Sequence, residues 1–482
     1  MSRFTLRSAR RPSPAWTLLA ASAAVFMCLL DALVVTTALP ALRNSLHGGL
    51  PDLEWTVNAY NLSFACLLLT GAALGDRFGR RRMLCAGLAV FTIASAAAAL
   101  SPTIGVLIAA RALQGAGAAM VMPLTLTLVA EAFPAERQAM AIGIWGAAGG
   151  LSGAAGPIVG GVVVQAAGWH WIFWINVPIG LALIPVAAVK VGESFGGRPR
   201  LDLGGLALAS AGLCGILWGL IRAGTAGWAS GEVIGALIGA TVVTAGFVLW
   251  ERRSPSPMLP LAMLRQPRFA AANSVSFCLF AGLFGALFLM SQFFQSAQHL
   301  TPSQTGARLL AWSAPGLVVM PAAGKLAARY GNRPFMVTGL LMQAAGLACV
   351  AVLARQHAGF GELCLPLILA GSGTSLVFPA IANEVVTSVP PSQIGIASGT
   401  NSALRELGGV FGVAILASVF TRPGAYTSAS TFTAGFSQAL WAGAALTAAG
   451  ILVTLPVKRP RLPAAPPEPA ETSSPAPAMS AS

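Results

Sequence analysis

Long apolar runs separated by short polar connections make up most of this chain. Fourteen runs can be marked, most of them about 20 residues long, which is the length that a helix needs to cross a hydrocarbon core of about 30 Å. The runs lie near residues 16–39, 55–75, 83–100, 103–130, 138–167, 170–190, 203–221, 232–250, 269–295, 308–328, 335–354, 363–386, 394–420 and 435–456. The pattern therefore predicts an all-α integral membrane protein with 14 transmembrane helices.

Composition and charge refine this prediction. Of the 482 residues, 56% are hydrophobic and only 9% are charged, whereas soluble domains carry about 25% charged residues. The formal net charge of +14 follows the connections, so it indicates membrane topology rather than a surface that binds nucleic acid. With a cytoplasmic N-terminus, the inside connections hold 22 Lys and Arg residues and the outside connections hold 5. Both termini are therefore expected in the cytoplasm, with the chain crossing the cytoplasmic membrane many times.

Two basic loops indicate an internal repeat. The loop Gly71–Arg82, GAALGDRFGRRR, matches Gly324–Pro334, GKLAARYGNRP, at an offset of 252 residues. A second match, at an offset of 256, sets Gly115, Gly117 and Pro123 on Gly371, Gly373 and Pro379. Two halves in the same orientation are one of the arrangements from which membrane transporters are built.

The repeat offset also predicts how the chain is divided. A half of six helices needs fewer residues than the offset provides, so two further helices are expected between the halves. The predicted parts are a cytoplasmic N-terminal segment (1–15), an N-terminal six-helix bundle (16–190), an inserted two-helix hairpin (191–252), a C-terminal six-helix bundle (253–456) and a disordered cytoplasmic tail (457–482). The hairpin spans carry no charge inside the membrane, which favours a structural role against lipid.

Several kinds of chemistry have no support in the sequence. The seven cysteines form no CxxC pair, and the four histidines lie in or beside connections without metal-ligand spacing, so no metal site is expected. The GxxxxGK[ST] stretch of ATP-binding proteins does not occur, and no catalytic constellation is visible on the connections. We therefore expect a protein that is not an enzyme and has no cofactor, with a proton gradient as its energy source.

Three charged residues inside apolar runs are the candidates for proton coupling. Asp31 lies deep in the first run, where an ionised carboxylate costs about 2.5–3.5 kcal/mol, so it is expected to be protonated, paired or facing water. Arg111 is always charged and must pair with an acid or with carbonyl groups, and its counterpart in the second half is Leu367. Glu406 is a second candidate acid. For Asp31 and Arg111 the alternative is a purely structural hydrogen bond or ion pair.

The fifth run combines glycines with an internal proline. Pro157 is expected to kink the helix, and the glycines would let neighbouring helices approach closely, as a rocking interface requires. The residues concerned are Gly143, Gly156, Pro157, Gly160 and Gly161. Ordinary packing of small residues remains the alternative for any single glycine.

Four stretches together resemble the major facilitator superfamily, and within it the fourteen-helix branch of drug:proton antiporters. They are the first-helix run Leu30–Pro40, the loop Gly71–Arg82, the fourth-helix run Arg111–Gly117 that closes at Pro123, and the fifth-helix set named above. The chain departs from the family pattern at Thr36, Ala72 and Ser152. The resemblance implies a proton-coupling role for Arg111, and a cytoplasmic latch that meets the opposing half in one conformation. The latch residues would be Asp76, Arg77, Gly79 and Arg80.

The sequence thus predicts a proton-driven exporter that works by alternating access around a central cavity. Its substrates would be hydrophobic small molecules, neutral or cationic, such as drugs, antibiotics or toxic metabolites. Its other partners would be protons and the lipid bilayer, without nucleic acid, and we expect a monomer. A proton-coupled uptake permease is the nearest alternative, which the fifth-helix motif speaks against, and a membrane-embedded enzyme is a more distant one.

Overall fold

The fold is that of a computed structural model, and it describes residues 13–196, 202–255, 257, 261–356, 358–390, 394–420 and 428–454. Most of the predicted N-terminal segment and the whole predicted tail lie outside the described residues. Within them, all regular secondary structure is helical, as the sequence predicts.

The helices follow the apolar runs closely. The first group comprises α1 (Pro14–Leu46), α2 (Leu50–Phe78), α3 (Arg80–Ala99), α4 (Ile104–Ala132), α5 (Ala135–Ala167), α6 (Trp171–Trp174) and α7 (Asn176–Lys190). Two helices follow, α8 (Leu203–Ala226) and α9 (Gly231–Arg253). The remainder are α10 (Leu261–Leu264), α11 (Pro267–Gln292), the π-helix η1 (Phe293–Ala297), α12 (Pro302–Ser313), α13 (Gly316–Tyr330), α14 (Asn332–Arg355), α15 (Phe360–Thr387), α16 (Ile394–Phe420) and α17 (Ala429–Thr454).

Twelve of the described helical segments are long and apolar enough to cross a membrane, and a bent α5 brings the number to 13. Helices α12 and α13 are each too short to qualify alone. The structure therefore shows a helical membrane protein with 12 to 13 candidate spans, and a count of 14 stays a prediction.

The bend in α5 has a local cause. The two arms, Met140–Gly153 and Ala155–Ala167, meet at 44°. Pro157 has no backbone N–H, so it cannot donate to the carbonyl of Gly153 one turn earlier. The kink expected from Pro157 is therefore present at the position where the proline removes a hydrogen bond.

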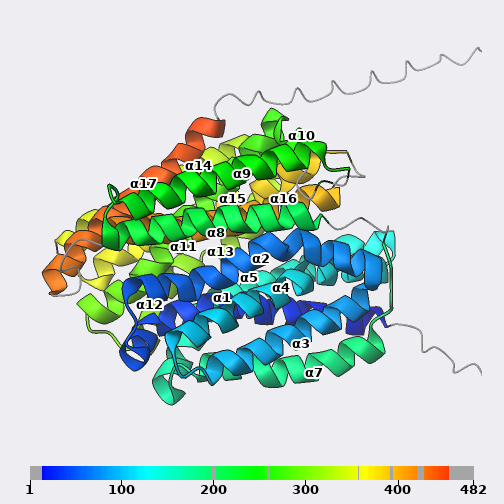
Figure 1. The fold of residues 1–482 in the computed structure, drawn as a ribbon, viewed down its shortest axis with the longest axis horizontal. Helices are drawn as coiled ribbons and strands as arrows, with labels where there is room; N and C mark the ends of the chain where they lie inside the picture. The colour runs from blue at the N-terminus through cyan, green and yellow to red at the C-terminus, as the bar shows by residue number, and fades with distance from the viewer. Residues whose placement is uncertain are drawn as a thin grey trace, which may run out of the picture.

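Figure 1 shows two groups of helices with α8 between them. Helices α1–α7 (blue to green-cyan) lie together on one side, and α11–α17 (green to orange) lie on the other. Helix α8 packs against α9, and also against α2 of the first group and α16 of the second. The inserted hairpin therefore contacts both groups through one helix.

Matching positions in the two groups make matching contacts. A side chain at Gly117 in α4 would meet the backbone of Gly87 in α3, and one at Gly373 in α15 would meet the backbone of Gly339 in α14. Small residues at these crossings let the helix backbones touch. Gly79 and Gly331, which precede α3 and α14, both have positive φ angles, of 106° and 85°.

The two groups of helices close against each other at one end of the molecule. We call the end with the α1–α2 connection the outer end and the end with Gly79 the inner end, following the predicted orientation. At the outer end, Gly161 of α5 lies against the backbone of Pro302, and Gly306 of α12 lies against the backbone of Pro157. In the inner arm of α5, side chains added at Gly143, Gly146 or Gly150 would meet no atom within 4 Å. The outer end is therefore closed, and three glycines of the inner arm have open space beside them, while Gly149 of the same arm lies against Leu29 of α1.

Labelling can test the predicted orientation at two exposed sites. A cysteine in place of Ser45, at the outer end of α1, should react with a membrane-impermeant maleimide on intact cells. A cysteine in place of Phe195, which is exposed after α7, should react only in inverted vesicles or permeabilised cells. The unmodified chain, with its seven native cysteines, gives the background. Reaction of both sites from the same side would contradict the topology.

Candidate functional site

Asp31 sits at the centre of a buried polar cluster in the first group of helices. Its side chain, on α1, is only 1% exposed. The carboxylate forms an ion pair with Nη1 of Arg111 and accepts hydrogen bonds from Gln114 Nε2 at 3.2 Å and Asn176 Nδ2 at 2.7 Å. An acid in an apolar helix is thus held by three donors from α4 and α7.

Arg111 extends the cluster to further helices. Its Nε donates to the backbone carbonyl of Thr56 in α2 at 3.2 Å, and its Nη1 donates to Gln114 Oε1 at 2.9 Å. The guanidinium lies over the ring of Tyr60, 4.4 Å from its centroid. Gln114 in turn donates to Ser95 Oγ in α3 at 2.7 Å. The cluster therefore ties α1, α2, α3, α4 and α7 together.

The structure shows which of the expected partners Asp31 and Arg111 have. Asp31 is paired rather than alone, and Arg111 has both an acid and a carbonyl as partners. The sequence did not predict that the two pair with each other. Gln114 stands in the run Arg111–Gly117 but was not assigned to the site, and Asn176 was not singled out. One available signal was spacing, because Gln114 lies three residues after Arg111 and so shares its helix face.

The contacts of Asp31 indicate how a proton on its carboxylate would affect the cluster. Hydrogen bonds and an opposite charge both favour the ionised form of a carboxylate. A proton on Asp31 would remove the negative charge that pairs with Arg111, and so weaken the ion pair. Protonation of Asp31 would be linked to movement between α1 and α4, which carry the two charges.

Glu406 occupies a separate place, on α16. It is buried, and its Oε1 accepts from Nη2 of the neighbouring Arg405 at 2.9 Å. The Arg405 guanidinium also lies over the ring of Phe280, at 5.3 Å. Among the described residues, Glu406 forms no ion pair with a residue of the first group of helices. No described hydrogen bond joins Glu406 to Asp31 or Arg111, but its charge acts on Tyr60, whose ring lies under the Arg111 guanidinium.

The predicted latch residues make their contacts within the first group of helices. Arg80 forms ion pairs with Asp76, at 2.6 Å, and with Glu131 at the end of α4. Gly79 makes the sharp connection between α2 and α3 that places Arg80 there. Arg77 is exposed and lies over the ring of Phe78. Among the described residues, none of these ion pairs reaches the second group, so a latch to the opposing half is not formed in this conformation.

The small residues of α5 face two different helices. Gly156 lies against Leu33 of α1, and Gly160 lies against Val34 and Thr37 of the same helix. Gly161 faces the start of α12 instead, whereas Gly143 has no neighbour. Helix α5 thus contacts its own group along one face and the opposing group at its outer end.

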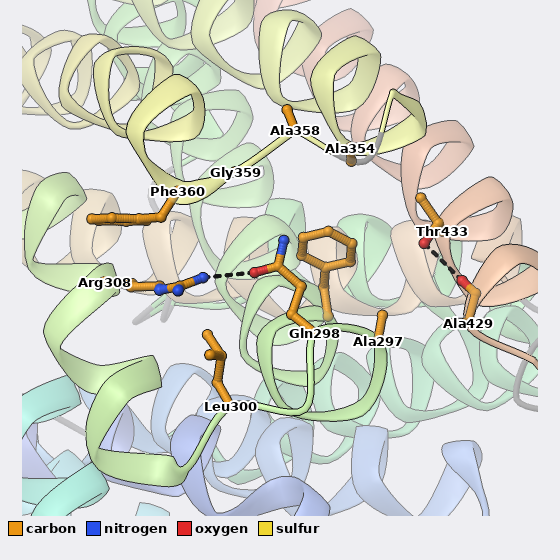
Figure 2. Close-up of a pocket in the computed structure, with 11 residues that line it drawn as sticks. Ala297, Gln298, Leu300, Arg308, Ala354, Ala358, Gly359, Phe360, Ala429 and Thr433 are labelled. Atoms are coloured by element: carbon orange, nitrogen blue, oxygen red, sulfur yellow. Dashed lines mark hydrogen bonds between the residues drawn. The ribbon is translucent and has the colours of Figure 1, made fainter.

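Figure 2 shows a cavity remote from these residues. It has a volume of about 340 Å³ and lies at the outer end of the second group of helices. Arg308 points into it and donates to Gln298 Oε1 at 2.7 Å, beneath the ring of Phe360. None of the candidate coupling, latch or α5 residues lines this cavity. Among the described residues, no group of three or more His, Cys, Asp or Glu side chains could hold a metal ion.

The chain is similar to a known family and to several characterised proteins. The family model described as Major Facilitator Superfamily matches residues 21–266 and 272–481. The chain is 36% identical to the tetracenomycin C resistance and export protein of Streptomyces glaucescens over 408 residues, covering 84% of this chain and 75% of that one. It is 38% identical to the multidrug resistance protein Stp of Mycobacterium tuberculosis over 405 residues, with the same coverages.

A solved structure shares the fold. It is the xylose transporter XylE from E. coli in a partially occluded inward-open conformation, with a TM-score of 0.62. The sequence identity is 15%, and the match covers 91% of this chain and 96% of that one. At this identity the likeness concerns the fold alone.

The buried ion pair should be costly to break from one side. Replacing Arg111 by Met leaves the Asp31 charge buried without its counter-ion, and we expect the free energy of unfolding to fall by about 3–5 kcal/mol. The double variant Asp31→Asn with Arg111→Met should recover much of that loss, because no unpaired charge remains. Thermal unfolding of purified protein in detergent measures both.

A matched control for this pair is Arg222→Met. Arg222 forms an exposed ion pair with Glu232 at 3.0 Å, so its loss should cost less than about 1 kcal/mol. If Arg111→Met and the double variant lost the same free energy of unfolding, the unpaired Asp31 charge would not be the cause of the loss.

Closure of the outer end should depend on Gly161. A valine there meets the backbone of Pro302, which cannot move aside as a flexible side chain could, so the Gly161→Val variant should hold the outer end apart. A cysteine placed at Thr37, which is fully buried at that end, should then react faster with an external maleimide. Gly150→Val, on the same helix in open space, is the control and should leave the rate unchanged. Slow labelling in both variants would rule out this contact as the closing surface.

Proposed function

The chain belongs to the Major Facilitator Superfamily, and from this premise we propose that it exports hydrophobic small molecules in exchange for protons. It is a multi-pass membrane transporter and not an enzyme. Its relatives are named as antibiotic and multidrug resistance and export proteins, which supports drug efflux. The proposed substrates are drugs, antibiotics or toxic metabolites, neutral or cationic, leaving the cytoplasm.

The Asp31–Arg111 pair is the observation that carries the proton coupling. It is an ion pair inside the membrane layer that joins α1 to α4, and a proton on its carboxylate would weaken that link. An antiporter must prevent an empty return, and one carboxylate that is either protonated or paired can do so if the two states favour opposite-facing conformations. A proton on Asp31 would release Arg111, and its departure would restore the pair.

Alternating access is supported by the packing of α5. Its outer arm closes on α12 through glycine contacts, while its inner arm is open. A bend at Pro157 separates the two arms, so one arm can pack while the other stays apart. In the opposite conformation the inner end would close, and Asp76, Arg77 and Arg80 would then act as the latch. This conformational role for Gly79 and its neighbours rests on the family resemblance.

For the whole chain we propose 14 spans, counting α5 as one and α12 with α13 as another. The parallel repeat is supported by the matching contacts of Gly117 and Gly373. The proposed units are residues 16–190, 191–252 and 253–456, with both termini cytoplasmic and a monomer as the working form. Helix α8 of the hairpin would stay packed against both bundles.

An uptake permease coupled to protons is the alternative. It would use the same ion pair, so the Asp31 cluster does not separate the two. The names of the relatives favour export, as does the resemblance of the α5 motif to exporters. Proteoliposomes of known orientation decide between them, because only an exporter accumulates cargo on the outer-end side when protons flow the other way.

The central test is Asp31→Asn. The amide imitates the protonated acid, so the variant should lose proton-driven export and most of the pH dependence of substrate binding. In the wild type, binding should weaken as the pH falls, because protons compete for the same carboxylate. Both proteins would be purified and titrated with a fluorescent cationic drug from about pH 5.5 to 8.5.

Asp52→Asn is the matched control, since this acid caps the start of α2 by accepting from Gly49 N at 2.8 Å and an asparagine can still accept there. It should behave like the wild type. Full efflux and an unchanged pH profile in Asp31→Asn would exclude Asp31 as the coupling residue, and Glu406 would be examined next.

A further inference from the structure

A second buried acid, Glu54, lies on α2 outside the Asp31 cluster. It is four residues from the start of the helix, about 6 Å along its axis from the outer end. The side chain is buried, at 2% exposure, and Oε2 has no hydrogen-bond partner among the described residues. No described ion pair involves it.

Asn58 lies one helical turn further on, so the two side chains share one face of α2. It is fully buried, and in the described part of the chain neither its Oδ1 nor its Nδ2 has a partner. In folded proteins about 90% or more of buried polar atoms are hydrogen-bonded. Three unpartnered atoms within one turn therefore point to a ligand or to a second arrangement in which they are satisfied.

Glu54 lies beside packing that the two groups of helices share near the outer end. Its neighbours Leu53 and Val57 belong to a buried core cluster that also contains Leu289 of α11 and Leu416 of α16. The cluster thus joins residues of both groups of helices. A group buried here is covered when the outer end closes and would meet water when the groups separate.

The charged residues on the helices packed against α2 have other contacts. Asp31 and Arg111 pair with each other, Arg405 pairs with Glu406, and Arg222 of α8 pairs with Glu232. The charges at the start of α3 pair with Asp76, Glu131 and Glu193 at the inner end. Arg43, at the outer end of α1, also has an interaction of its own. None of the described ion pairs supplies a counter-ion to Glu54.

The closed packing limits what can occupy this position. An ionised carboxylate in an apolar layer is costly unless it is paired or hydrated. At 2% exposure there is almost no open space around Glu54 for a substrate or a hydrated ion. A proton needs no such space and removes the charge.

We propose that Glu54 is a proton-binding site that controls the outer gate. The carboxylate takes one proton from the outer side to become a neutral acid when the gate closes, and it returns that proton to the outer side when the gate opens. Asn58 donates to the ionised carboxylate in the open state. The site rests on the proposed alternating-access function but adds no proton to the transport stoichiometry, which Asp31 carries.

A distance measurement across the outer end tests this proposal. Spin labels would be attached to cysteines at Ser45 of the first group and at Gln356 of the second, both exposed, in a transport-active background without the native cysteines. In the wild type, raising the pH should increase the population with the longer distance. In Glu54→Gln, a permanently neutral acid, that response should be lost and the short distance should dominate at every pH.

Two further variants sharpen the test. Glu362→Gln makes the same change at an exposed acid in the first turn of α15, at the outer end, and should keep the wild-type response. Asn58→Leu removes the donor to the ionised carboxylate, so the midpoint of the distance change should move to higher pH. A residue that only fills space would not move the midpoint.

The outcomes separate this proposal from the proposed function. A wild-type distance that ignores pH, or a Glu54→Gln response equal to that of the wild type, overturns the gate even if Asp31→Asn abolishes proton-driven export. Loss of the pH response in Glu54→Gln in a protein that shows no proton-driven export supports the gate and contradicts the antiport function.

Discussion

One constraint shapes the first group of helices: charge buried in a membrane layer must be satisfied inside the protein. Asp31 and Arg111 meet it with an ion pair, two amide donors and a backbone carbonyl. These partners come from α1, α2, α4 and α7, so the pair fixes how those four helices stand relative to one another. A switch placed at this pair acts on the whole group, because any change in its bonding is felt at every helix that contributes.

Alternating access also requires the two groups of helices to separate at one end and close at the other. The small residues of α5 suit such a contact. Where it touches α1 and α12, glycine lets backbones come together without interlocking side chains. A glycine contact has no interlocking side chains to disengage. The outer end can therefore open in one step when the α5 and α12 backbones move apart. Contacts to α1 continue on both sides of the bend, through Gly149 and Gly160, whereas Pro157 and Gly161 also face α12.

The sequence predicted the features that follow from local rules. A charge in an apolar run is rare, so Asp31 and Arg111 stood out, and a proline within a helix has one local effect, which the bend of α5 confirms. Their pairing joins residues 80 positions apart and needs the packing of α1 on α4. Glu54 was missed for a related reason. It lies just before the apolar run 55–75, where an acid is ordinary, and its burial becomes visible only in the packed structure.

The two buried acids differ in what surrounds them, and that difference assigns them opposite states in one conformation. Asp31 has a counter-charge and two amide donors while the outer end is closed. Among the described residues Glu54 has no ion-pair partner and its Oε2 has no donor, and in the proposed gate it is neutral while this packing is closed. When the groups of helices move, Asp31 must lose its partners to gain a proton, whereas Glu54 must lose a proton to gain partners. A single rearrangement would therefore shift the two acids in opposite directions, which lets one conformational cycle bind a proton at one site as it frees a proton at the other.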